Sequence, residues 1–437
     1  MSYPSFAALR ELLNGLELYA QLKHEYGAEG VAAQVDAVED ALANALEAVR
    51  ALPEDPVLAA REPDDLPSIR ALRPAGPRAI WQSFDQAEYR RRLEGALLGR
   101  FAGCTLGAPV EFWPVERMAA WAREIGDAFP PVDYWSDIPE RHAFRYHTSR
   151  TDAYTRDKLD GVPVDDDVTY TLLGLLIAEE YGLDFTTAEV GRAWLRRLPM
   201  ACTAEHVALE NLKRGVPAEQ AGATENPYCQ WIGADIRSDP WGYLAPGLPE
   251  KAAAMACRDA YLSHRRNGIY GEIFFAAAIA AAFTVDHPLA AIEIGLTEIP
   301  ADCALAGDVR WALEMAPRIT DYRAARAAVD ARFAGMSGVH TNNNACLTIW
   351  GLSIGGTDFT RVIGETVAMG LDNDCTAATA GSIAGAIIGR EGIPPHWYAR
   401  FNNTVHTYLN HHPQFAIDEV VDRFTAQAAK AFASFRQ

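Results

Sequence analysis

The sequence lacks several features that would indicate a secreted or membrane-bound protein. Its 7 cysteines are scattered through 437 residues and include no C-x-x-C pair, which indicates free thiols rather than a disulfide framework. The N-terminus "MSYPSFAALREL" has no basic segment followed by an apolar one, so we expect no signal peptide. The longest apolar run, "IFFAAAIAAAF", is too short to cross a bilayer. We therefore expect a cytoplasmic protein that does not contact membranes.

Positive charge is scarce as well. The chain has 39 Lys and Arg against 58 Asp and Glu, which gives a formal net charge of -19 at pH 7. A surface this acidic repels phosphate backbones and anionic lipids, so nucleic acid is not an expected partner. The hydrophobic fraction of 49% is ordinary for a globular protein with a large core. The sequence does not determine the oligomeric state, and a homo-oligomer is one of the possibilities.

Alternating strand patterns are few, whereas helical spacing and helix-forming composition recur along most of the chain. The clearest helical segments are residues 90–107, 169–182, 203–215, 249–264, 271–283 and 378–389. We therefore predict an all-α fold whose polar and Gly-rich loops carry the chemistry.

The N-terminal part differs from the rest. The spacing of apolar residues predicts two helices in the first fifty residues. Residues 52–77 follow, with 6 prolines, and predict an extended connector. We therefore divide the chain into a helical appendage with its proline-rich connector, residues 1–85, and a main domain, residues 86–437. The appendage is expected to serve packing or association and not chemistry.

Acidic residues gather at three places in the main domain. Glu111 follows a Gly-spaced helix, Asp165–Asp167 directly precede another helix, and Asp372 and Asp374 open "DNDCTAATAGSIAG". A helix N-terminus stabilises carboxylates, so one Asp at each start could be only a cap. Three consecutive aspartates exceed what a cap needs, and grouped carboxylates are unfavourable unless a cation neutralises them. Oxygen ligands favour Mg²⁺, Mn²⁺ or Ca²⁺ over zinc. Spacing alone leaves capping and metal binding both open.

Three motifs, in order, resemble those of the ADP-ribosylglycohydrolase superfamily. "GALLGRFAGCTLGAPVE" resembles its opening G-x-x-x-G-x-x-x-G-D-A-L-G-x-P-x-E, "VDDDVTYTLL" stands where it has T-D-D-T, and "GLDNDCTAATAGSIAG" where it has G-G-D-T-D-T-x-A-x-x-x-G-x-x-x-G. The resemblance covers about residues 90–400. It implies that residues 86–437 form a compact orthogonal multi-helix catalytic domain with two metal ions, Mg²⁺ or Mn²⁺, at the bottom of a cleft.

The resemblance also implies roles for individual residues. The implied metal ligands are Asp165, Asp166, Asp167, Asp372, Asp374 and Cys375, and the implied catalytic residues are Glu111, Asp166 and Asp167. Asp165 and Cys375 stand where the family usually has Thr. A thiol is a soft ligand in a hard site, so Cys375 either ligates or packs passively. Gly381 and Gly385 would let helices pack closely enough to bring the acid clusters together.

The substrate contacts are expected from the middle of the chain. "NPYCQWIGADIRSDPWGYLAPG" loosely resembles the family's G-N-G-x-x-M-R-x-x-P loop. An aromatic ring there could stack on adenine, and an arginine could pair with a pyrophosphate. The candidates are Asp235, Arg237, Trp241, Tyr243, His264 and Asn344. Ordinary packing is the alternative for each.

These features lead to one main hypothesis and two alternatives. The main one is a metal-dependent hydrolase that cleaves a glycosidic bond at the ribose anomeric carbon of an ADP-ribosylated substrate, with a carboxylate that accepts the proton of the attacking water. The substrate could be an ADP-ribosylated protein or a small ribosylated metabolite. The first alternative is an N-glycosidase that acts on a small nucleoside or nucleotide. The second is a relative that binds a ribosyl group without turnover.

Overall fold

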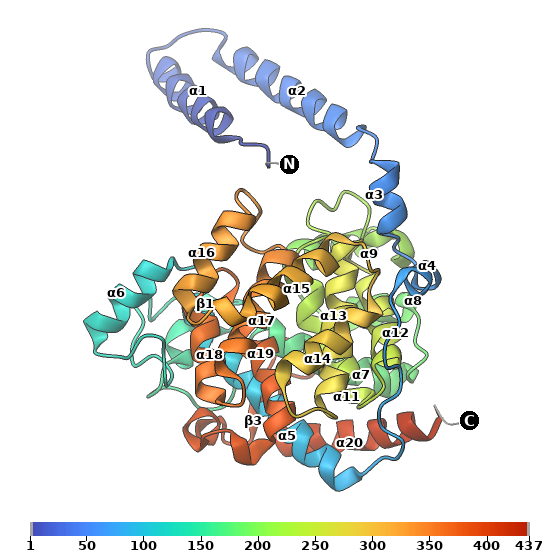
Figure 1. Cartoon of the computed structure of the whole chain (residues 1–437). Coiled ribbons are helices and arrows are strands. Elements are labelled where there is room, and N and C mark those ends of the chain that lie inside the picture. The colour runs from blue at the N-terminus through green and yellow to red at the C-terminus, as the bar shows by residue number, and fades with distance from the viewer. Residues whose placement is uncertain (1–2, 435–437) are drawn as a thin grey trace. The chain divides into compact units, whose positions relative to one another are not determined.

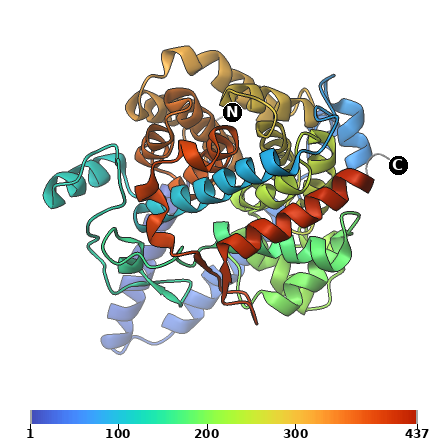
Figure 2. The ribbon, with the colours of Figure 1, turned by 90° about the horizontal axis from the view of Figure 1, so that it is seen from below.

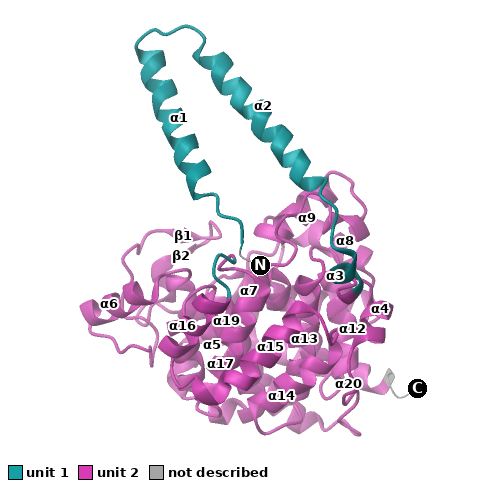
Figure 3. Ribbon diagram, turned by 45° about the horizontal axis from the view of Figure 1, so that its top comes forward, with its two compact units in different colours: residues 1–60, 333–336 teal, residues 61–332, 337–437 magenta. Residues whose placement is uncertain are grey.

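The computed structural model describes residues 3–434 and divides into two compact units, coloured separately in Figure 3. The smaller unit comprises residues 1–60 and 333–336. It contains α1 (Ala7–Glu25) and α2 (Val31–Arg50), which confirms the two predicted helices. Neither helix has a buried residue, so the pair forms no core of its own.

The prediction of an extended connector is wrong, because two short helices lie within it. These are α3 (Pro56–Arg61) and α4 (Leu66–Leu72). Proline is accommodated because it stands in the first turn of each helix, where its missing N–H has no intrahelical partner to lose. Asp65 caps α4 by accepting a hydrogen bond from the Ser68 N–H at 2.9 Å.

The larger unit begins at Arg61, before the division that we placed at residue 85. Ile69 of α4 is fully buried in this unit. Arg73 pairs with Glu250 at 2.6 Å and also with Glu298. Residues 61–85 are therefore packed against the main domain rather than free of it.

Helices form nearly all of the larger unit, which confirms the all-α prediction (Figure 1). After α4, they are α5 (Gln86–Gly107), α6 (Val115–Ile125), α7 (Asp166–Tyr181), α8 (Thr187–Arg197), α9 (Thr203–Lys213), α10 (Ala218–Ala221), α11 (Ser238–Leu244), α12 (Pro249–Ala260), α13 (Asn267–Ala282), α14 (Pro288–Gly295), α15 (Ala304–Met315), α16 (Tyr322–Arg332), α17 (Thr341–Gly355), α18 (Phe359–Ala368), α19 (Asn373–Ile388) and α20 (Ile417–Ser434).

Shorter elements connect these helices. The 3-10 helices are η1 (Ala108–Val110), η2 (Thr151–Tyr154), η3 (Ile232–Arg237), η4 (Leu296–Glu298), η5 (Ala316–Arg318), η6 (Arg390–Gly392), η7 (Pro395–Trp397) and η8 (Ala399–Phe401). The strands pair antiparallel as β1 (Phe144–Arg145) with β2 (Ser149–Arg150), and β3 (Thr404–His406) with β4 (Gln414–Ala416).

All of the longest apolar run of the sequence except its last residue, Phe283, lies in α13, where every residue is buried. This placement explains why α13 is apolar on all sides, since neighbouring helices surround it. Within residues 3–434, no helix has the length and apolar character needed to cross a membrane.

The closest helix pairing of the larger unit joins α5 and α19, and α5 also runs beside α20 on the face seen in Figure 2. A Cβ atom added at Gly381 would lie 2.2 Å from the backbone oxygen of Gly99, and one added at Gly385 would lie 2.1 Å from that of Gly95. Glycine is therefore required on both helices, which confirms the predicted packing role of Gly381 and Gly385. The close approach brings the end of α5 to the start of α19.

Replacing Gly381 with alanine should destabilise the protein. The backbone oxygen of Gly99 cannot make room as a flexible side chain could, so the helices must separate, at a cost of about 1–3 kcal/mol or more. Gly307 of α15 is the matched control, because a Cβ there meets nothing within 4 Å. Gly307→Ala should stabilise by about 0.5–1 kcal/mol. Urea unfolding measures the free energy of unfolding of both variants. Equal changes in the two variants would contradict the close-packing argument.

Candidate active site

The two aspartate clusters lie in the first turns of α7 and α19. Asp165 is the N-cap of α7, and its Oδ1 accepts a hydrogen bond from the Asp167 N–H at 3.2 Å. Asp372 stands at the N-cap position of α19 but makes no capping hydrogen bond with its side chain. Capping therefore accounts for Asp165 and leaves Asp372 and Asp374 without a structural role of that kind.

An arginine joins the clusters. Arg145 of β1 donates from Nη2 to Asp165 Oδ2 at 2.9 Å and to Asp374 Oδ2 at 3.0 Å. Its Nη1 donates to Glu111 Oε2 at 2.6 Å. The three acidic places of the sequence thus meet around one guanidinium. Sequence reasoning missed Arg145, because a single arginine in a loop carries no pattern that distinguishes it.

Two further side chains hold the aspartates of α7. Tyr146 donates its hydroxyl to Asp166 Oδ1 at 2.6 Å. Arg100 of α5 donates to Asp167 Oδ1 at 3.0 Å and to Asp239, and its side chain is completely buried. The sequence did hold a signal for Arg100, since a charged residue inside the buried, Gly-spaced second half of α5 needs a buried partner.

Strained backbone lies beside two of the acids. Phe112 follows Glu111 with φ of 59°, and Leu371 precedes Asp372 with φ of 60°. The Phe112 N–H donates to the Leu371 carbonyl at 3.0 Å, which ties the two loops together. A non-glycine residue in this region costs about 1–3 kcal/mol, and such strained residues cluster at functional sites.

Burial opposes ionisation of these carboxyl groups. It raises the pKa of Glu111 to about 7, although Arg145 lowers it. It raises the pKa of Asp167 to about 8 against the opposing effect of Arg100. Burial and neighbouring carboxylates also raise the pKa values of Asp166 and Asp374. The cluster therefore needs protons or additional positive charge to be stable.

Several carboxylate oxygens in the cluster lack a strong hydrogen-bond donor. Asp167 Oδ2, Asp372 Oδ1 and Asp374 Oδ1 are buried and accept no hydrogen bond from a nitrogen or a hydroxyl group. The weakly donating thiol of Cys375 lies beside Asp167 and Asp372. Buried acceptors of this kind are costly unless a cation binds them.

Two groups of side chains have ligand atoms within 4.8 Å of one another. They are Cys104 with Asp165 and Asp167, and Asp372 with Asp374 and Cys375. The unpaired oxygens together with these groupings fit a divalent cation.

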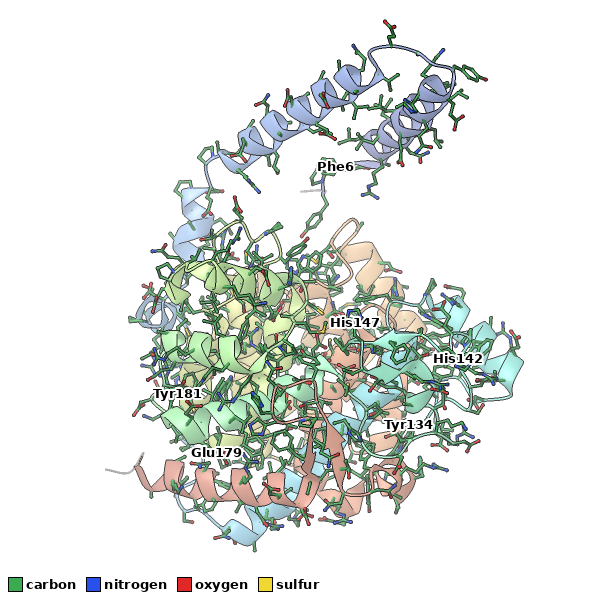
Figure 4. All side chains as sticks on the ribbon, turned by 180° about the vertical axis from the view of Figure 1, so that it is seen from behind. Phe6, Tyr134, His142, His147, Glu179 and Tyr181 are labelled. Atoms are coloured by element: carbon green, nitrogen blue, oxygen red, sulfur yellow. The ribbon has the colours of Figure 1, made fainter. Side chains whose placement is uncertain are left out.

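A cleft of about 480 Å³ opens onto the cluster. Its wall includes four predicted site residues, Glu111, Asp166, Asp372 and Cys375. Its other lining residues are Phe112, Phe144, Arg145, Tyr146, His147, Met200, Cys202, Thr203, Glu205, Trp231, Ile232, Gly233, Ile236 and Val339. His147, labelled in Figure 4, belongs to the turn between β1 and β2. The cleft is large enough for a ligand of nucleotide size, with aromatic rings beside the acids.

The six predicted substrate contacts lie elsewhere. Asp235, Arg237, Trp241, Tyr243, His264 and Asn344 are buried, and none is among the described residues that line the cleft. Arg237 pairs with Glu205 and Asp259, each at 2.6 Å, and Trp241 Nε1 donates to Glu272 at 2.9 Å. These contacts favour the packing alternative for both.

The other four candidates also have internal partners. Tyr243 donates to Asp239 at 2.9 Å, and His264 Nδ1 lies 2.8 Å from the Ser263 hydroxyl. Asp235 accepts from Thr341, and Asn344 accepts from the Asp372 N–H at 3.4 Å. Asn344 therefore supports the loop that carries Asp372 without facing the cleft. These placements do not support the predicted substrate roles.

His340 should make stability depend on pH. Its Nδ1 caps α17 by accepting from the Asn342 N–H at 3.1 Å, and burial lowers its pKa from 6.5 to about 4. Because the folded-state pKa is the lower one, this contribution is present above pH 6.5 and is lost as the pH falls toward 4. Asparagine keeps a capping acceptor without titrating.

Between pH 6.5 and 4, the wild-type protein should lose about 2 kcal/mol more unfolding free energy than His340→Asn. Urea unfolding at both ends of this range measures the difference. Equal losses in the two proteins would contradict the assignment to His340.

The chain is similar to proteins of a known family. The ADP-ribosylglycohydrolase family profile matches residues 85–431. A search of curated proteins gave no match. A solved structure described as an "ADP-ribosylglycohydrolase-related protein complex" superposes with a TM-score of 0.51 at 21% identity, over 79% of this chain and 99% of the other. That likeness shows a shared fold, and the profile match covers most of the chain. The chain therefore belongs to the ADP-ribosylglycohydrolase family.

Proposed function

We propose that the protein is a metal-dependent hydrolase that cleaves the glycosidic bond at the ribose anomeric carbon of an ADP-ribosylated substrate. Membership of a glycohydrolase family supports hydrolysis in general. The observation that carries the proposal is the meeting of Glu111, Asp165 and Asp374 around one guanidinium at the cleft wall. These acids come from three separate elements, because Glu111 follows η1, Asp165 caps α7 and Asp374 lies in the first turn of α19.

The ion would be held by oxygens that lack other partners. Asp167, Asp372 and Asp374 each have one such oxygen, and Cys375 lies beside them. Hard oxygen ligands favour Mg²⁺ or Mn²⁺. When bound, the ion would act as a Lewis acid toward ribose hydroxyls.

Glu111 would accept the proton of the attacking water. Its carboxyl group lines the cleft, and burial raises its pKa to about 7, which is close to the working pH of a general base. Arg145 holds the carboxylate in place by its hydrogen bond at 2.6 Å. Asp166, which also lines the cleft and is held by Tyr146, would stabilise the positive charge that develops on the sugar.

A second candidate substrate is a small nucleoside without a pyrophosphate. Among the described residues that line the cleft, the only basic side chains are Arg145 and His147. Arg145 is already paired with three carboxylates, so the lining offers little charge for a pyrophosphate. Aromatic rings such as Tyr146 and Trp231 could still stack on a base.

A substrate panel tests the proposal and separates the two candidates. It comprises ADP-ribosylated arginine, ADP-ribosylated serine and unphosphorylated nucleosides, each incubated with Mg²⁺ or Mn²⁺ and with a chelator. Chromatography with mass detection would show released ADP-ribose under the first candidate and free ribose under the second. No release from any compound, with the metal bound, would support a relative without turnover.

A further inference from the structure

Arg145 lies among carboxylates that the sequence motifs identified as expected metal ligands. Its guanidinium donates to carboxylates of Glu111, Asp165 and Asp374, and also to the Ala108 carbonyl at 2.8 Å. Only 14% of its side chain is exposed. Arginine keeps its charge at every relevant pH, and its planar donors suit carboxylates. The cluster therefore already contains one cation that belongs to the chain itself.

The carboxylate oxygens that Arg145 does not contact are those that a metal ion could still bind. Asp165 has no free oxygen, since Oδ1 accepts from the Asp167 N–H and Oδ2 from Arg145. The Cys104–Asp165–Asp167 group has thereby lost a ligand to the guanidinium. The group formed by Asp372, Asp374 and Cys375 keeps two unpaired carboxylate oxygens, and Asp167 Oδ2 adds a third.

The hairpin that carries Arg145 is fixed at the site. β1 and β2 pair Arg145 with Ser149, and the intervening turn holds Tyr146 and His147 at φ of 50° and 57°. Tyr146 is anchored by its hydroxyl to Asp166 at 2.6 Å and packs against Tyr408 with ring centroids 5.4 Å apart. Two consecutive residues of the hairpin are thus bound to different aspartates, which opposes withdrawal of the guanidinium.

We propose that Arg145 replaces one of the two metal ions expected from the sequence motifs, so that the protein binds one divalent ion per chain. The inference rests on the proposed metal dependence and is independent of the substrate. A second ion in contact with both Asp165 and Asp374 would have to displace the guanidinium, because oxygen ligands lie about 2.0–2.6 Å from such ions. The positive charge of Arg145 would also repel it.

The ion count tests this inference. Purified protein is freed of metal, and Mn²⁺ binding is measured by titration calorimetry and by native mass spectrometry. We expect one Mn²⁺ per wild-type chain and two per chain of Arg145→Gln. Arg150→Gln is the matched control, because it removes the same charge from the same hairpin, where Arg150 is 45% exposed and pairs with Asp152. The control should still bind one ion.

Arg145→Gln leaves carboxylates unpaired and could misfold, so a second variant keeps the inference testable. The double variant Arg145→Gln with Asp165→Thr removes one positive and one negative charge, and threonine can still cap α7. It should also bind two ions. Two ions in the wild type, or one ion in both variants, would overturn the inference while leaving metal dependence intact. No binding in any protein would overturn both this inference and the proposed metal dependence.

Discussion

Replacing Asp374 with asparagine should abolish glycosidic bond cleavage and the stabilisation that Mn²⁺ gives. The change replaces one of the two carboxylate oxygens with an amide nitrogen and keeps the shape of the side chain. The one remaining oxygen cannot both accept from Arg145 and serve as a metal ligand. A ligand that binds only the folded state at 100 times its Kd stabilises by about 2.7 kcal/mol. We expect this increment in the wild type and almost none in Asp374→Asn, as measured by thermal unfolding with and without Mn²⁺.

Stability without metal should change in a different way. Burial next to Glu111 and Asp372 raises the pKa of the Asp374 carboxyl group even beside Arg145, so its charge is unfavourable in the absence of a bound metal ion. The metal-free variant should therefore be about as stable as the wild type, or more stable. Asp330→Asn is the control, because that carboxylate is 58% exposed and pairs with Arg326 of the same helix, α16. A full Mn²⁺ response in Asp374→Asn would refute its role as a ligand.

Replacing Glu111 with glutamine should lower kcat by about 100- to 10,000-fold, because general base catalysis contributes that much. The amide can still accept a hydrogen bond from Arg145 but cannot take a proton from water. KM should change little, since the cleft keeps its shape. Steady-state kinetics on the substrate identified by the panel gives both constants.

The control for Glu111 is Glu116→Gln in the first turn of α6, which removes the same charge from an exposed position nearby. It should leave kcat and KM unchanged. The Mn²⁺ affinity of Glu111→Gln should also be close to that of the wild type, because Glu111 is not in either ligand group. A large rise in KM with an unchanged kcat would assign Glu111 to substrate binding and not to proton transfer.

The sequence predicted the fold better than the site. The predicted helical segment at residues 90–107 lies inside α5, and the one at residues 271–283 matches α13 except for its last residue. Both were found because apolar periodicity and glycine spacing repeat over many residues. The prediction of an extended connector at residues 52–77 is wrong because it treats proline only as a helix breaker. Proline also begins helices, as it does in α3 and α4. The loose loop match did reach the cleft, since Trp231 of that loop lines it, but the residues chosen within the loop, such as Trp241, lie in the core. Composition does not distinguish an aromatic on the cleft wall from one in the core.

The sequence by itself determined the all-α class and the placement of the aspartates at helix starts. Each is a local property, set by spacing within one segment. Only the tertiary structure decided that Arg145 lies among the acids. Its carboxylate partners are 34, 20 and 229 residues away along the chain, so no local pattern could reveal the contact. The number of metal ions that the cluster would bind follows from that contact. The guanidinium neutralises part of the negative charge of the carboxylates and occupies oxygens that a second metal ion would use as ligands.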